Sequence, residues 1–194
     1  SIPPADFINK ILSCYQEHSI NHPIGIIGPG IRNLLKGDSE DIKTGILFKG
    51  IRKYSPEIGD LTAVSFCIAS GSLIPVKVLL DVGMMEEELF IDGIDIEYCF
   101  RLQSFKYEVY QTNRTYLEHC LGDGSDKKVE SHSPLREFYI MRNSVWMIKK
   151  KYIPIGFRIR KLFSSVGRII YSVASLNPKY VFADLKGIVK GISQ

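Results

Sequence analysis

Two aspartates three residues apart are the groups in this chain best suited to proton transfer. Asp92 and Asp95 lie where a polar turn meets an apolar pattern that predicts a helix over 94–105. The dipole of a helix favours acids at its N-terminus, and a carboxylate held at the end of an element can act as a general base. A simpler interpretation is that either aspartate only caps the helix. The spacing alone favours this second interpretation, because caps are far commoner than catalytic bases.

A resemblance to a known family changes that balance. The run F-I-D-G-I-D-I-E-Y-C-F-R (90–101) resembles the signature of family 2 inverting sugar-nucleotide glycosyltransferases, most of all their rhamnosyltransferase branch. The resemblance implies that Asp95 is the catalytic base, Glu97 the second acid of the motif and Arg101 its closing arginine. Glu97 and Arg101 are four apart and can also pair on the helix face. Many members have a glutamate directly before the base; this chain has isoleucine there, so Asp92 is expected to supply the neighbouring carboxylate.

Two shorter motifs flank this signature. The run S-F-C-I-A-S-G-S-L-I (65–74) resembles the strand and S-G-S-L turn of the family, which implies that Ser70 and Gly71 lie near the donor sugar or the acceptor. Glycine would let the backbone approach a ligand closely, although a plain strand-to-helix turn explains the run equally well. The run L-E-H-C-L-G-D (117–123) resembles the family's H-x-x-G-D, in which His119 could contact a metal or pyrophosphate. A structural role for this histidine is the alternative.

A longer motif follows at H-S-P-L-R-E-F-Y-I-M-R-N (132–143), which resembles H-S-P-x-R-x-Y-Y-x-x-R-N of the rhamnosyltransferase branch. Because a guanidinium suits phosphate, either Arg136 or Arg142 is expected to reach the donor pyrophosphate. The other is expected to face an anionic, lipid-linked acceptor. Pairing of both arginines with Glu137 and other acids is the alternative.

The resemblance covers roughly residues 60–150 and carries further expectations. It implies a partial nucleotide-diphospho-sugar transferase domain of the A-type, Rossmann-like α/β fold, and transfer of a sugar from a nucleotide-sugar donor to a glycan or polyprenyl-linked acceptor. The implied donor is dTDP-L-rhamnose, and Mg²⁺ or Mn²⁺ would assist the leaving diphosphate. No D-x-D motif, which holds metal and nucleotide in the family, occurs in the sequence. We therefore expect the donor-binding half to be absent from this chain.

The periodicity of apolar residues predicts two regions of different class. Up to residue 120, strands alternate with helices, which is typical of an α/β fold; the helices are expected over 4–18, 75–82 and 94–105, and the strands over 24–27, 46–54, 63–69, 107–111 and 115–119. Beyond that, three helices are expected over 134–151, 155–176 and 179–190. We accordingly predict one domain over 1–132 and a helical extension over 133–194.

The extension is strongly basic. From Met147 onward the chain has ten lysines and arginines and a single acid, Asp184. Apolar residues at helical spacing between these bases predict an amphipathic helix at a membrane surface, with Trp146 and Tyr152 as headgroup anchors. Packing of this helix on the body is the alternative. No nucleic-acid motif accompanies the bases, so a nucleic-acid partner is not expected.

The expected location is the cytoplasm, peripheral to the inner face of the plasma membrane, because the sequence shows no signal peptide and no apolar run long enough to span a bilayer. The four cysteines are dispersed and are expected to be reduced thiols. Two other functions are kept as hypotheses. One is a non-catalytic membrane-associated module, and the other is a different metal-dependent enzyme that uses Asp92, Asp95 and His119.

Overall fold

The computed structural model describes residues 2–33, 39–40, 57–119 and 133–193. They belong to two compact units, a first one of 1–84 with 98–128 and a second one of 85–97 with 129–194. The acidic stretch before the signature helix therefore groups with the C-terminal helices and not with the sheet. The predicted domain boundary at residue 132 stays a prediction.

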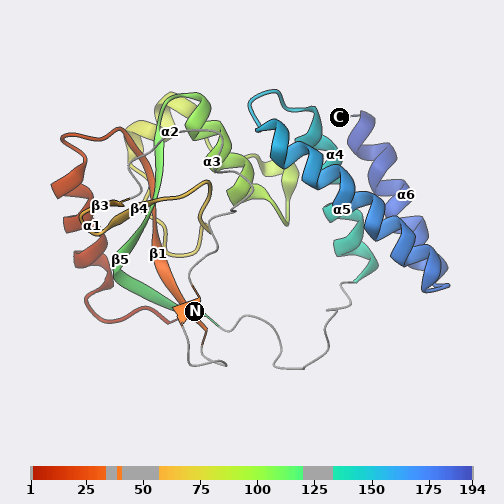
Figure 1. Ribbon diagram of the computed structural model, residues 1–194, viewed down its shortest axis with the longest axis horizontal. Helices are drawn as coiled ribbons and strands as arrows, with labels where there is room; N and C mark the ends of the chain where they lie inside the picture. The colour runs from red at the N-terminus through yellow and green to blue at the C-terminus, as the bar shows by residue number, and fades with distance from the viewer. Residues whose placement is uncertain (1, 34–38, 41–56, 120–132, 194) are drawn as a thin grey trace. The chain divides into compact units, whose positions relative to one another are not determined.

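The first unit is built on a mixed sheet of the strand order β2-β1-β5-β4-β3. The long neighbours β1 (Ile24–Asn33) and β5 (Glu108–His119) run parallel (Figure 1). The short strands β2 (Ser39–Glu40), β3 (Glu57–Ile58) and β4 (Leu61–Ala63) pair antiparallel with their neighbours. The predicted mixture of helices and strands is confirmed. The Rossmann-like A-type assignment stays a prediction.

Helix α1 (Phe7–His18) covers the two central strands. Its buried residues Phe7, Ile11 and Cys14 recur every three or four positions, which places them on one face. That face packs against a core that includes Ile27 and Leu117 from the strands. The helix predicted over 4–18 is thus confirmed, and burial of its apolar face fixes it on the sheet.

Between β4 and β5 the chain forms α2 (Val76–Val82), the 3₁₀ turn η2 (Glu87–Leu89) and α3 (Ile94–Ser104). Helix α2 ends at Gly83, whose φ of 88° suits glycine. The strand predicted over 63–69 is wrong for most of its length, since β4 ends at Ala63. Apolar residues there are buried in irregular backbone, and a short buried run does not specify a strand. The strand predicted over 46–54 lies outside the described residues.

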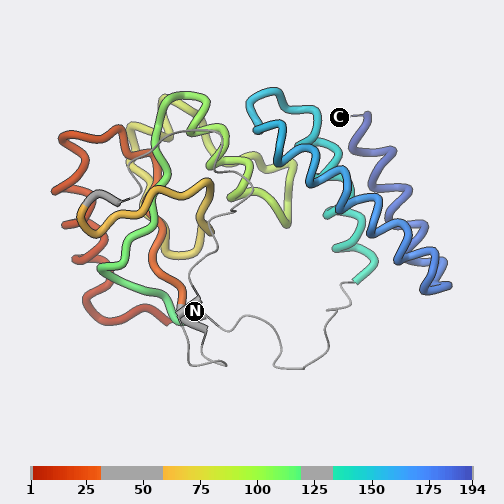
Figure 2. Tube along the Cα trace, viewed as in Figure 1, coloured from red at the N-terminus to blue at the C-terminus, as the bar shows by residue number. Residues whose placement is uncertain are grey.

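Three helices, α4 (Pro134–Lys149), α5 (Ile155–Ala174) and α6 (Pro178–Ser193), make up most of the second unit. They pack side by side (Figure 2). Ser133 caps α4 by accepting a hydrogen bond from the backbone N–H of Arg136, and Pro134 occupies the first turn. All three predicted helices are confirmed. None of the helices among the described residues has the length and apolarity to cross a bilayer.

One of the two predicted headgroup anchors is buried, and the other is half-buried. Trp146 is buried in the second unit, and Phe157 of α5 is buried as well. The hydroxyl of Tyr152 donates a hydrogen bond to the carboxylate of Glu97 at 2.5 Å. The predicted amphipathic helix is present, and burial of Trp146 is at odds with its predicted role as an anchor, while the role of Tyr152 stays a prediction.

Candidate active site

The loop before α3 has an unusual backbone. Phe90, Asp92 and Gly93 have φ values of 56°, 61° and 94°. A non-glycine residue with positive φ costs on the order of 1 to 3 kcal/mol and persists only where its surroundings hold it. Such residues gather at functional sites, so the contacts that hold this loop are informative.

Asn143, in the middle of α4, makes the most extensive of these contacts. Its side-chain Nδ2 donates to the carbonyl oxygens of Leu89, Ile91 and Asp92, at 2.8, 2.6 and 2.9 Å. Asn143 is only 1% exposed. A buried amide that serves three carbonyls of one loop fixes the path of that loop. Asn143 is the last residue of the motif at 132–143, but the sequence pattern predicted no role for it.

Arg142 orients this amide. Its guanidinium donates to the Oδ1 of Asn143 at 2.8 and 3.0 Å, which turns the Nδ2 of Asn143 towards the loop. Arg142 also donates to the carbonyl oxygen of Glu88 and lies over the ring of Tyr139. Burial lowers the pKa of Arg142 from its usual range. The structure therefore shows Arg142 as part of the support of the loop, while its predicted contact with phosphate stays a prediction.

Arg136, in the first turn of α4, holds the side chain of the loop. Its Nε and Nη2 donate to the two carboxylate oxygens of Asp92, at 2.9 and 3.0 Å. Both side chains are partly exposed. Such a two-point contact between a guanidinium and a carboxylate fixes orientation as well as distance. Asp92 is thus one half of an ion pair.

Asp95 is in a different environment from Asp92. The backbone N–H of Glu97 donates to the carbonyl of Gly93, so Gly93 occupies the N-cap position and Asp95 lies inside the first turn. The side chain of Asp95 is half-buried, and its Oδ1 accepts from the N–H of Ile96 at 2.9 Å. A capping side chain normally accepts from the N–H two or three residues onward. The printed contact of Asp95 is thus with the next residue, and the capping interpretation stays the alternative to a catalytic role.

Glu97 is fully buried and accepts the hydrogen bond from Tyr152 described above. A buried carboxylate needs such partners, because loss of water around an unpaired charge is costly. The contact joins the first turn of α3 to the turn that follows α4. Five predicted site residues are thus brought together in the second unit, namely Asp92, Asp95, Glu97, Arg136 and Arg142.

The other predicted residues lie in the first unit. Arg101 donates to the carbonyl oxygens of Val82 and Met84, at 3.3 and 2.9 Å, and so secures the chain at the end of α2. His119 ends β5, opposite Asn33, and its imidazole lies outside the described part of the structure.

The S-G-S-L turn is attached to the sheet in the first unit. Leu73 exchanges two backbone hydrogen bonds with Ile27 of β1. Ser70 and Gly71 are exposed, and Gly71 has a φ of 69°, where a side chain would also meet the ring of Phe7 at 3.0 Å. This turn therefore requires glycine for its own geometry, whether or not a ligand approaches it.

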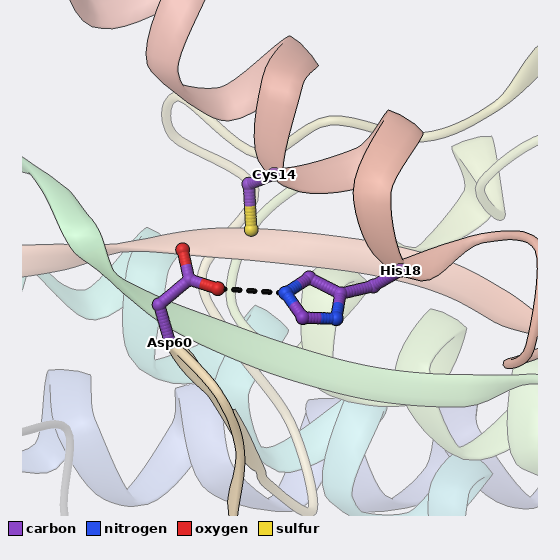
Figure 3. A group of neighbouring side chains, drawn as sticks. All are labelled: Cys14, His18 and Asp60. Atoms are coloured by element: carbon purple, nitrogen blue, oxygen red, sulfur yellow. Dashed lines mark hydrogen bonds and ion pairs between the residues drawn. The ribbon is translucent and has the colours of Figure 1, made fainter.

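One group of three potential metal ligands occurs among the described residues, at Cys14, His18 and Asp60 (Figure 3). Its donor atoms lie within 4.8 Å of one another, and the Nε2 of His18 is 2.7 Å from the Oδ1 of Asp60. This group could not be predicted from the sequence, because Asp60 is far from the other two residues in the chain.

Two features make this group better suited to an ion-pair network than to a cation. The Nε of Arg114 lies 2.5 Å from the Oδ2 of Asp60. Burial raises the pKa of the Cys14 thiol to about 11, so the thiol stays protonated near neutral pH, whereas a metal binds the thiolate. Burial also acts to raise the pKa of Asp60, but the hydrogen bond with His18 and the charge of Arg114 outweigh it and leave that pKa lowered.

With this geometry in hand, comparison with known proteins identifies a relative. Over 200 aligned residues, 97% of this chain, the sequence is 32% identical to the dTDP-rhamnosyl transferase RfbF of Shigella flexneri. The chain is a homologue of a rhamnosyltransferase. It spans 66% of the length of that relative, just under two thirds. No protein-family description matches the chain, and no solved structure matches it.

The similarity agrees with the resemblance seen in the sequence. It extends beyond residues 60–150, which carry the motifs, to almost the whole chain. Membership of family 2 and an inverting mechanism stay predictions, as do the roles of the individual site residues.

Proposed function

We propose that this chain is part of an inverting glycosyltransferase that transfers L-rhamnose from dTDP-L-rhamnose to a glycan acceptor in surface polysaccharide synthesis. The observation that carries the proposal is the set of hydrogen bonds from the side chain of Asn143 to three carbonyls of the loop that leads to Asp95. A site that must place one carboxylate accurately needs such a rigid support. The relative named as a dTDP-rhamnosyl transferase supports the choice of donor.

In the proposed reaction Asp95 is the general base. Its carboxylate takes the proton of an acceptor hydroxyl while the hydroxyl oxygen attacks the anomeric carbon, and the bond from that carbon to the diphosphate oxygen breaks. The new bond forms on the opposite face of the sugar, so the anomeric configuration inverts. Asp92 is paired with Arg136, and Glu97 is buried against Tyr152. Asp95, half-buried in the first turn of α3, is the acid to which the sequence resemblance assigns the proton.

A divalent cation is implied by the resemblance, as Mg²⁺ or Mn²⁺ that would neutralise the leaving diphosphate. The described acids of the candidate site do not gather three ligands for it; the group at Cys14, His18 and Asp60 lies in the first unit. We therefore assign no step of the reaction to a cation held by the described residues. Because the sequence has no D-x-D motif, we likewise assign no step of nucleotide binding to the described acids.

The proposed acceptor is a glycan on a polyprenyl carrier, and the proposed location is the inner face of the plasma membrane. The basic C-terminal helices support this assignment, because anionic lipids attract lysine and arginine at a membrane surface. A nucleic-acid partner is not proposed.

The test uses the full-length protein with dTDP-L-rhamnose, and with dTDP-D-glucose as a competing donor. We expect release of dTDP with the rhamnose donor, in preference to the glucose donor, in the presence of a lipid-linked glycan acceptor. NMR of the product should show inversion at the anomeric carbon. Retention of configuration would exclude the proposed role of Asp95. Failure of a folded protein to turn over either donor would favour the non-catalytic module.

A further inference from the structure

Helix α5 presents its apolar side outward and its polar side inward. Its buried side chains are Phe157, Ser165 and Ser172, and the partly buried Arg168 on the same stripe pairs with Glu137 of α4. Its exposed side chains include a set of large apolar ones, at Ile159, Leu162, Phe163, Val166, Ile170 and Val173. A helix that packs on a water-soluble core shows the opposite pattern.

Helix α6 likewise has apolar residues outside and small or polar residues inside. It buries Ala183, Asp184, Gly187 and Gly191 and exposes Phe182, Leu185, Val189 and Ile192. The exposed residues recur every three or four positions, so they form a continuous apolar ridge. Polar and small residues inside, with apolar residues outside, are expected where the surroundings of a helix pair are lipid.

The contact between α6 and α4 supports this interpretation. A Cβ atom on Gly187 would lie 2.6 Å from the carbonyl oxygen of Phe138, and one on Gly191 would lie 2.7 Å from that of Arg142. The two glycines form a G-x-x-x-G pattern, which lets backbones approach closely and is typical of helices packed in membranes. Because the small residues of α6 pack closely against α4, the large side chains of α6 lie on the outer surface.

Charge identifies the kind of surface that would meet these helices. Exposed bases flank the apolar residues, at Arg160, Lys179, Lys186 and Lys190. The one acid in α5 and α6, Asp184, is buried. Where the two helices meet, Leu176 is 89% exposed beside an apolar groove of about 400 Å³ lined by Val173 and Phe182 among others. Apolar side chains rimmed by cations match an anionic lipid surface.

We propose that α5 and α6 form a hairpin whose outer face lies in the headgroup region of an anionic bilayer, with the turn at Leu176 inserted most deeply. This inference deepens the proposed function, and it rests on that function only in placing a lipid-linked acceptor at the same surface. We take anionic lipid as the occupant of the apolar face, because bases flank it, and a second copy of the chain is the contrary outcome of the test.

The test is sedimentation of the purified chain with vesicles of phosphatidylcholine alone or mixed with phosphatidylglycerol. We expect binding to the mixed vesicles that weakens with salt and is at least about tenfold weaker without the anionic lipid. The double variant Phe163→Ser, Phe182→Ser removes two exposed aromatic rings and should lower vesicle binding at least about tenfold. The matched control Leu80→Ser, at an exposed site on α2, should bind as the parent chain does.

A second measurement reports insertion directly. Phe163→Trp replaces one exposed aromatic by another, and its fluorescence should shift to the blue and be quenched by brominated lipids, whereas the buried Trp146 should not respond. Absence of vesicle binding by the folded chain would overturn the proposal. So would a dimer, detected by light scattering, that the double variant abolishes. Transfer to a soluble acceptor should be unchanged in the double variant, so loss of docking and failure of the proposed function are distinguishable.

Discussion

The guanidinium of Arg136 holds both oxygens of the Asp92 carboxylate, at 2.9 and 3.0 Å, and so ties the first turn of α4 to the loop that leads into α3. Asp92 is therefore fixed in orientation and neutralised, although both partners keep access to solvent. The ion pair gives the loop a support that is separate from the buried contacts of Asn143.

Replacement of Arg136 tests this support. Arg136→Lys keeps the charge but cannot form two parallel hydrogen bonds. Because the pair is partly exposed, the free energy of unfolding should fall by less than about 1 kcal/mol. The kcat/KM for sugar transfer should fall about tenfold or more, since misplacement of a catalytic group is costly. Arg160→Lys, at an exposed site on α5, is the control and should change neither; equal effects of the two variants would contradict the proposed role.

Removal of the Asn143 amide should affect stability more strongly. Asn143→Leu removes the side-chain donor that three loop carbonyls share, although the carbonyl of Leu89 keeps the backbone N–H of Ile91. Loss of a buried polar partner costs about 1 to 3 kcal/mol or more. Urea denaturation followed by the fluorescence of Trp146, the single tryptophan, reports on the second unit. The control Asn113→Leu, exposed on β5, should stay within about 0.5 kcal/mol of the parent. A similar small change in Asn143→Leu would show that the amide does not hold the loop.

The sequence predicted the elements with a strong helical period, and the structure confirms α1, α3 and the three C-terminal helices. It did not predict the contacts that shape the candidate site. Asn143 occurs in the recognised motif, but its three acceptors lie more than 50 residues earlier in the chain. A buried asparagine in the middle of a helix is itself a signal, since this residue is disfavoured there without a partner.

The packing of Tyr152 and Trp146 was likewise not predictable from the sequence. Their amphipathic chemistry and their basic neighbours predicted a membrane anchor, yet Trp146 is buried and the hydroxyl of the half-buried Tyr152 bonds to Glu97. Composition identifies the kind of environment that a segment suits, whereas the side that each residue faces depends on tertiary packing. The inverted pattern of α5 and α6 became visible only when the exposure of each side chain was known.

Two helical glycines, Gly191 of α6 and Gly167 of α5, differ in the space around them. Gly191→Ala places a methyl group 2.7 Å from the carbonyl of Arg142, and this clash should lower the free energy of unfolding by about 1 to 3 kcal/mol. Gly167→Ala, on α5 with nothing within 4 Å, should instead raise it by about 0.4 to 1 kcal/mol, because alanine favours the helix. Thermal unfolding monitored by Trp146 measures both. Opposite signs are required; two changes of the same sign would contradict the packing described for α6.

Asp184 makes the stability of the second unit depend on pH. Its carboxylate is buried, and burial together with the nearby charge of Glu137 raises its pKa against the opposing effects of Ser172 and Arg168. A raised pKa in the folded state means that stability is highest when the acid is protonated and is lost as pH rises from the unfolded value of about 3.9 through the folded value. Asp184→Asn should therefore be more stable than the parent at neutral pH and should lack this decline. A parent chain that gains stability over the same rise in pH, followed by Trp146, would contradict the assignment.

The most direct test of the central claim is the rate of rhamnosyl transfer by Asp95→Asn in the full-length protein. The amide keeps the size of the side chain but cannot accept the proton of the acceptor hydroxyl. We predict that kcat falls at least about a hundredfold, with the far-ultraviolet spectrum and the affinity for dTDP-L-rhamnose unchanged. Asp6→Asn, on the exposed surface of the first unit, should retain full activity. A folded Asp95→Asn protein that transfers rhamnose at the parental rate would contradict the assignment of Asp95 as the base.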